Sequence, residues 1–259
     1  MSEPVLVVRA GDIATVTLNN PDKLNALGLA SWKCLGRILR ELDADKALRC
    51  VVIRGAGDKA FAAGADISEF EKTRNNAKAG RKYGEQIEKT MEAIALCRHP
   101  IVAMIHGACV GGGLETASQC DLRICGTSSR FGIPIAKLGL VVGYGEMKGL
   151  LDLVGRVATM EILLEGRILN AAEAKDMGLV NRVVADDKVE EEAMAAARRI
   201  AAGAPLVARW HKKFAQRLAD PRALTLAERD EAYACFDTED YREGVRAFLA
   251  KRKPEFKGR

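Results

Sequence analysis

The sequence predicts an α/β protein whose C-terminal part is entirely helical. Three features support this: short apolar segments typical of buried strands, amphipathic helical segments between them, and no strand patterns after about residue 186. Of the 259 residues, 48% are hydrophobic and 29% are charged, as in an ordinary folded globule. The net charge of +5 is dispersed among acidic residues, which suits an anionic small molecule at least as well as a nucleic acid.

Strand and helix patterns alternate in the N-terminal part. The alternation IATVTL and the apolar runs CVVI and IVAMI are typical of strands, and turn residues such as Pro21, Gly55 and Pro100 interrupt the pattern. The expected strands are residues 5–8, 13–18, 50–53, 101–105 and 122–125, and the expected helices are about 32–42 and 79–96. Because βαβ connections are right-handed, this order predicts either a spiral or a doubly wound sheet.

The C-terminal part consists of four expected helices that begin near residues 186, 205, 224 and 238. The last has the clearest start, with Thr238 as N-cap and Glu239 and Asp240 in the first turn. Helices without strands to cover must bury their apolar faces on their own core or on a neighbouring subunit. We therefore divide the chain into a core of residues 1–190 and a helical region of residues 191–259.

The cysteine, histidine and N-terminal patterns bear on the compartment of the protein, on metal binding and on membrane insertion. The seven cysteines are odd in number and contain no CxxC pair, which predicts free thiols in a reducing, cytoplasmic compartment. The three histidines lack metal-ligand spacing, so no metal is expected. The N-terminus lacks a signal-peptide pattern, and no apolar run is long enough to span a membrane.

Two loops rich in small residues are the candidates for chemistry. Residues 61–67, FAAGADI, follow the expected strand 50–53, and on this segment alone a tight strand-to-helix connection with Asp66 as N-cap is the better explanation. Residues 106–115, HGACVGGGLE, follow the strand 101–105 and place Glu115 in the first turn of a helix. Their three consecutive glycines suggest a backbone that approaches a ligand, and free N–H groups at the helix start can stabilise an oxyanion.

Competing explanations of the glycine-rich loop are weaker. A phosphate loop requires Gly-Lys-Ser/Thr and a dinucleotide loop requires G-x-G-x-x-G, and neither is present. An acid in the first turn of a helix is common because it suits the helix dipole, so Glu115 has a structural explanation as well as a catalytic one.

These two segments, in this order and each after a strand, resemble the signature of the enoyl-CoA hydratase/isomerase (crotonase) family. The resemblance covers nearly the whole chain and includes NPDKLNAL at 20–27, GRILNAAEA at 166–174, GLVN at 178–181 and FLAKRKP at 248–254. It implies a spiral of ββα turns that carries the coenzyme A (CoA) site, followed by a helical trimerisation region. It also implies a homotrimer or homohexamer that acts on an acyl-CoA thioester without a further cofactor.

By position, the resemblance assigns the oxyanion hole to the backbone N–H groups of Ala65 and Gly112 and a catalytic carboxylate to Glu115. The implied CoA-binding residues are Lys23, Leu24, Ala26, Ala63, Asp66 and Ile67. The adenine is expected near Ala63.

The sequence departs from the family at the second catalytic glutamate. Hydratases of this type usually hold one water between two glutamates: one removes its proton, the role that Glu115 matches, and the other protonates the α-carbon. The second position, after Pro134, is Ile135, which can neither bind water nor transfer a proton. Some relatives carry an aspartate where this chain has Gly143. Tyr144 and Glu146 are nearby polar groups that offer a replacement, although both also suit the start of a helix.

The leading interpretation is a hydratase-type lyase with Glu115 as its acid/base. Because Ile135 replaces the second glutamate, a decarboxylase, isomerase or hydrolase of a CoA thioester is an alternative. A non-catalytic CoA-binding or assembly module is an alternative of another class, and the intact loops argue against it.

Overall fold

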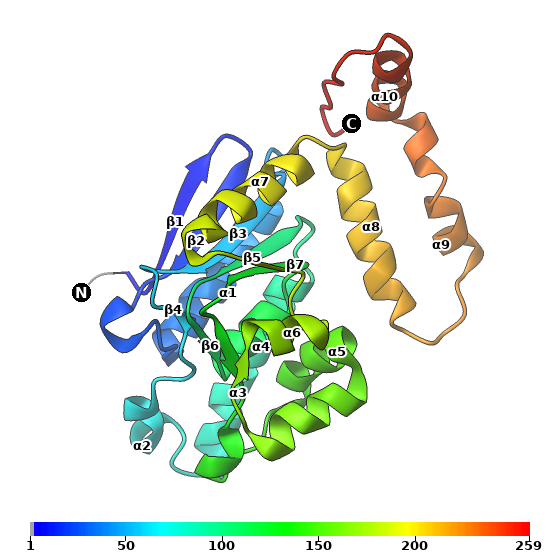
Figure 1. Cartoon of the computed structure of the whole chain (residues 1–259). Coiled ribbons are helices and arrows are strands. Elements are labelled where there is room, and N and C mark those ends of the chain that lie inside the picture. Colours follow the sequence, from blue (N-terminus) through cyan, green and yellow to red (C-terminus); the bar gives the residue numbers. More distant parts are fainter. Residues whose placement is uncertain (1–2) are drawn as a thin grey trace.

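The computed structural model describes residues 3–259, and its core contains two sheets (Figure 1). One sheet has six strands in the order β1-β2-β3-β5-β7-β10, and the other has four in the order β4-β6-β8-β9. The strands are β1 Val5–Ala10, β2 Ile13–Leu18, β3 Cys50–Gly55, β4 Ala60–Ala62, β5 Ile101–Ile105, β6 Ala108–Val110, β7 Leu122–Gly126, β8 Arg130–Gly132, β9 Leu169–Asn170 and β10 Arg182–Val184.

Successive strand pairs wind the chain into a spiral. The pairs β3/β4, β5/β6 and β7/β8 each place their first strand in the large sheet and their second in the small one, and a helix follows each pair. The pairings β3–β5, β5–β7, β4–β6 and β6–β8 are parallel. The spiral of ββα turns implied by the resemblance is therefore confirmed, and the doubly wound alternative is excluded.

Ten α-helices lie in the described part of the chain, residues 3–259. They are α1 Leu29–Ala44, α2 Phe70–Thr73, α3 Ala77–Ala95, α4 Gly112–Ser118, α5 Tyr144–Glu165, α6 Ala171–Asp176, α7 Val189–Ala201, α8 Pro205–Leu218, α9 Leu226–Glu231 and α10 Glu239–Leu249. The helix expected to begin near residue 224 is short, since α9 starts at Leu226 and ends at Glu231. Thr225 and Glu228 form a capping box that starts α9, and the chain then tightens into a 3-10 turn, η5 (Ala234–Asp237).

Both faces of the central strands of the large sheet, β3 and β5, are buried. Alternate residues of the central strands point to opposite faces, so Val51 and Ile53 join the main core while Val52 and Val102 face α7. Because α7 covers the sheet through Val189 and a row of alanines, the predicted boundary between residues 190 and 191 falls inside a helix of the core.

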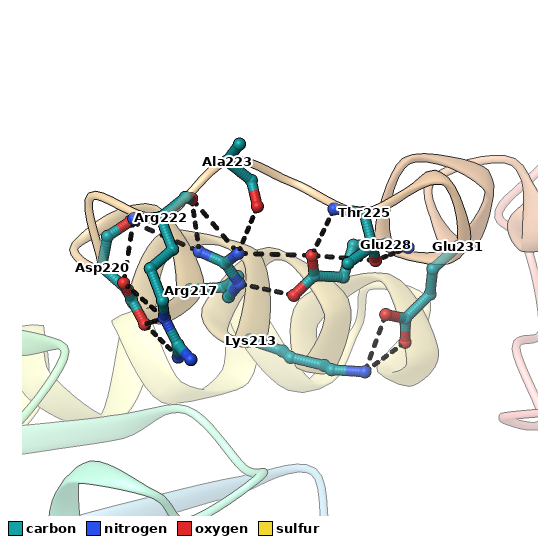
Figure 2. A network of polar contacts seen from close by, with 8 residues as sticks. All are labelled: Lys213, Arg217, Asp220, Arg222, Ala223, Thr225, Glu228 and Glu231. Atoms are coloured by element: carbon teal, nitrogen blue, oxygen red, sulfur yellow. Dashed lines mark hydrogen bonds and ion pairs between the residues drawn. The ribbon is translucent and has the colours of Figure 1, made fainter.

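The last three helices project from this body (Figure 1). α8 is tied to the core by polar contacts, including Lys212 Nζ to Asp121 Oδ2 at 2.8 Å. Figure 2 shows that Lys213 and Arg217 on α8 pair with Glu231 and Glu228 on α9, which fixes the two helices side by side. Several large apolar side chains of this arm remain exposed: Leu226, Tyr233, Phe236, Phe248 and Leu249.

Candidate functional site

The two small-residue loops meet at a cavity of about 560 Å³. Its wall is formed by the loop after β4, the loop between β6 and α4, one side of α3, and the segment from Ile133 to Glu146 that leads into α5. Most of the remaining lining is apolar or glycine, and Glu115, Glu146 and Arg74 bring charged groups to it.

The predicted oxyanion donors, Ala65 and Gly112, both line this cavity. Within the described residues, neither backbone N–H donates a hydrogen bond to a protein acceptor. Ala65 pairs with Leu27 in an isolated β-bridge, but the N–H of Ala65 is not one of its donors. Gly112 is the first residue of α4, where a backbone N–H has no acceptor within the helix. A glycine with positive φ precedes each donor, Gly64 at 110° and Gly111 at 49°. The sequence pattern thus produces two converging backbone donors.

Close packing explains why small residues are required here. A Cβ at Gly113 would lie 2.3 Å from the carbonyl oxygen of Ala62, which is a clash. Gly111 has room for a Cβ, but its φ of 49° favours glycine. Larger residues would push the two loops apart and separate the donors.

Glu115 enters the cavity from the first turn of α4 and is only 7% exposed. In the described part of the chain its carboxyl group has no hydrogen-bonding partner from the protein. Burial and, to a smaller extent, the negative charge of Glu146 raise the pKa of Glu115 to about 8, against the opposing effect of the Arg74 charge. The carboxyl is therefore protonated at neutral pH.

Glu146 is the second carboxyl group of the cavity. It stands in the first turn of α5, where its Oε2 accepts a hydrogen bond from Gly143 N at 2.7 Å. Burial raises its pKa, while this hydrogen bond and the charge of Arg74 lower it. The capping role that the sequence offered as the structural explanation is present, and the carboxyl also faces the cavity.

The other residues discussed near this segment lie differently. Ile135 lines the cavity and packs against the main core, so it contributes an apolar wall. Tyr144 is 96% exposed and is absent from the cavity lining. The structure therefore brings Glu146, and not Tyr144, to the side of Glu115.

The predicted CoA-binding residues gather at one rim of the cavity. Lys23 Nζ lies 2.7 Å from Asp66 Oδ2, and Ala63 N donates to the carbonyl of Leu24 at 3.0 Å. Ala63 and Ile67 line the cavity, whereas Lys23, Leu24, Ala26 and Asp66 lie outside its lining. Leu24 and Ile67 leave large apolar side chains exposed there.

Buried Asn25 shapes this rim. Leu24 and Asn25 have positive φ values of 49° and 58°. The Asn25 side chain donates to the carbonyls of Ala56 and Ala60 at 3.0 and 2.8 Å, and these bonds hold the strained turn in place.

Three cavity residues escaped the sequence analysis: Trp32 on α1, Arg74 at the end of α2, and Tyr83 on α3. The tryptophan appeared there only as the first residue of the expected helix 32–42. Nothing in the neighbourhood of Arg74 or Tyr83 distinguishes them from other surface or helix residues, because their elements meet only in the folded chain.

Residues 3–259 contain no group of three or more histidine, cysteine, aspartate or glutamate side chains arranged to hold a metal ion. In the same residues, no helix combines the length and apolar character that a membrane crossing requires.

Comparison with known proteins gives consistent results. The family model described as enoyl-CoA hydratase/isomerase matches residues 9–259. A protein of Rhizobium meliloti named "Probable enoyl-CoA hydratase" is 39% identical, over 99% of each chain. A "Short-chain-enoyl-CoA hydratase" of Clostridium acetobutylicum is 36% identical, over 98% of each chain. The crystal structure of an enoyl-CoA hydratase/carnithine racemase from Magnetospirillum magneticum has a TM-score of 0.98 and 48% identity, covering 100% of this chain and 97% of that one.

Proposed function

The chain belongs to the enoyl-CoA hydratase/isomerase family and is an acyl-CoA-processing enzyme of the hydratase type, and from this premise we propose that Glu115 and Glu146 together add water to an enoyl-CoA in the cavity. The observation that carries the proposal is that both carboxyl groups face one cavity with two free backbone donors. The names of the relatives favour hydration over decarboxylation, isomerisation, hydrolysis and a non-catalytic role.

The backbone donors polarise the thioester. Its carbonyl oxygen accepts from the N–H groups of Ala65 and Gly112, and these bonds strengthen as the oxygen gains negative charge. A donor of this kind contributes about 3–4 kcal/mol where such sites have been dissected. The β-carbon thereby becomes electrophilic.

The two carboxyl groups divide the proton transfers. Two like charges in one buried site resist simultaneous ionisation, so the pair holds one proton near neutral pH. Both carboxyl groups lie in the first turn of a helix, but only Glu146 accepts a hydrogen bond, from Gly143 N, and this bond favours its ionised form. Glu146 accepts a proton from water as its oxygen bonds to the β-carbon, and Glu115 protonates the α-carbon of the enolate. Return of the proton from Glu146 to Glu115 restores the site.

Glu146 compensates for the carboxylate missing at position 135 by occupying the place of a side chain at position 143. A Cβ at Gly143 would lie 3.2 Å from Glu146 Oε2, so this carboxyl occupies the space where a side chain of residue 143 would begin. That is the position of the aspartate in some relatives. In this proposal Glu115 donates the proton, which reverses the role implied by the resemblance.

We propose that the CoA moiety lies along the rim formed by Lys23, Leu24, Ala26, Ala63, Asp66 and Ile67. The ion pair of Lys23 with Asp66 joins the two rim segments, and the exposed side chains of Leu24 and Ile67 offer apolar contact to the nucleotide. CoA is then part of the substrate, and no other cofactor takes part.

Replacing Gly112 with proline tests the oxyanion hole. Gly112 is the first residue of α4, a position that tolerates proline, so the change deletes the N–H with little disturbance of the helix. We expect kcat for crotonyl-CoA hydration, followed by loss of the enoyl thioester absorbance, to fall about 10²–10³-fold.

Gly112→Ala is the matched control. It adds the same Cβ, which would lie 3.0 Å from Trp32 Cζ2, but keeps the N–H. If Gly112→Ala loses as much activity as a folded Gly112→Pro, the loss comes from crowding and Gly112 is not an oxyanion donor.

We also propose that the helical C-terminal region, residues 191–259, which includes the arm formed by α8, α9 and α10, assembles the chain into a homotrimer or homohexamer in the cytoplasm. A mainly apolar groove between α8 and α10, lined by Val207, Tyr241, Phe248 and Phe256, supports this. The seven cysteines are all unpaired, which supports a reducing compartment.

Light scattering should give a multiple of three 28.0 kDa chains. A monomer at micromolar concentration would refute the assembly.

A further inference from the structure

The cavity contains three buried polar hydrogens without an acceptor. Trp32 Nε1, Arg74 Nε and Tyr83 Oη are each inaccessible to solvent and have no hydrogen-bond partner in the described chain. Trp32 and Tyr83 are 1% and 2% exposed, and all three residues line the cavity that holds Glu115. Buried donors are almost always paired in folded proteins, so three together indicate a missing acceptor.

Arg74 is held in place by aromatic rings. Its guanidinium carbon lies 3.8 Å from the centroid of the Tyr83 ring and 4.5 Å from that of Phe70. No carboxylate lies within 4.0 Å of its nitrogens in residues 3–259, so its charge is uncompensated by a direct ion pair. A planar guanidinium fixed in this way is arranged to bind a planar anion at low entropic cost.

The three groups lie together, and Tyr83 Oη is the one acceptor among them. Burial raises the pKa of Tyr83, while the neighbouring donors of Arg74 and Trp32 lower it. The hydroxyl hydrogen of Tyr83 has no acceptor within the group. The surrounding wall, including Ile87, Ile133 and Ile135, is apolar. A purely aliphatic acyl group would fill the space but leave every donor unpaired.

We propose that the acyl group of the natural substrate ends in a carboxylate, which binds to the guanidinium of Arg74 where this side chain, stacked on Tyr83, lines the cavity. The natural substrates are then thioesters of dicarboxylic acids. The inference rests on the proposed function, because it assumes that the cavity receives the acyl chain. A carboxylate supplies the negative charge that Arg74 lacks, and its shape matches the guanidinium fork.

Binding of saturated thioesters isolates this preference from catalysis. Succinyl-, glutaryl- and adipyl-CoA are each compared by calorimetry with the isostere in which an isopropyl group replaces the carboxylate, for example 5-methylhexanoyl-CoA for glutaryl-CoA. At the length that fits, the carboxylate should bind about 10- to 100-fold more tightly in the wild type, as expected for hydrogen bonds to a charged group. Equal or tighter binding of the isopropyl compound at all three lengths would overturn the proposal.

Variants identify the residues responsible. Arg74→Met should abolish or invert the preference, and Tyr83→Phe, which keeps the ring against the guanidinium, should reduce it. Arg81→Met on the exposed side of α3 is the control and should leave the preference unchanged. A preference that survives both Arg74→Met and Tyr83→Phe would assign the carboxylate to another site and refute this one.

Failure of this inference is distinct from failure of the hydration mechanism. Glu115→Gln should keep the carboxylate preference while losing activity, because the binding groups do not include Glu115. Hydration of crotonyl-CoA without any carboxylate preference would refute only the substrate class. A carboxylate preference with unimpaired hydration in Glu115→Gln would refute only the mechanism.

Discussion

Glu115→Gln is expected to lower kcat for hydration of an enoyl-CoA by about 10²–10⁴-fold, the usual contribution of a positioned general acid. Glutamine keeps the size of the side chain but has no proton that it can release to the α-carbon. The change also removes a buried ionisable group, so the folded protein should be at least as stable as the wild type at alkaline pH. Initial rates with crotonyl-CoA measure the effect, and thermal unfolding checks the fold.

Glu85→Gln is the matched control, since this residue lies exposed on α3 outside the cavity. It should leave kcat unchanged. Unimpaired hydration by a folded Glu115→Gln variant would show that another group protonates the α-carbon.

The same assignment determines the pH profile. The pKa of Glu115 is raised to about 8, so the required proton is present at neutral pH and is lost as the pH rises through that value. Glu146 must be ionised, and its raised pKa places the acid limb above the usual range for a glutamate. The plot of kcat/KM against pH should be a bell, and Glu115→Gln should remove its alkaline limb. An alkaline limb that persists in the variant would belong to a different group.

Much of the fold could be predicted because its strands are long enough to show a pattern. The segments 13–18 and 101–105 have five or six residues whose burial leaves a clear apolar signature. The small sheet was missed because its strands have only two or three residues, as in β9 Leu169–Asn170, and this is below the length at which periodicity can be recognised.

The candidate site was predicted where function depends on backbone. Gly111 and Gly112 are visible in the sequence because glycine is required at a close approach, whereas the contacts of Arg74 with Phe70 and Tyr83 arise only when α2 and α3 pack together. The choice between Tyr144 and Glu146 had a physical basis in helix geometry. Two residues apart on a helix, they point about 200° apart, so only one can face the cavity.

Glu146→Gln is expected to reduce hydration by about 10²–10⁴-fold, because the water then lacks a base. Glutamine can still cap the helix through its side-chain oxygen, so the Gly143 N–H keeps an acceptor and the start of α5 should remain folded. Rates with crotonyl-CoA measure the loss. If the folded variant retains wild-type activity, Glu146 has only the capping role.

Adding Ile135→Glu to the Glu146→Gln variant tests whether the two positions are interchangeable. Ile135 lines the cavity, so a glutamate there should again place a carboxylate beside the attacking water. The hydration rate of the double variant should be at least about tenfold higher than that of Glu146→Gln alone. Ile135→Gln in the same background has nearly the same shape without the ionisable group and should restore nothing. Burying a carboxyl against the core lowers stability and raises its pKa, so the rescued activity should rise toward alkaline pH relative to the wild type. Equal rescue by glutamine would mean that space or polarity at position 135, and not a base, limits hydration.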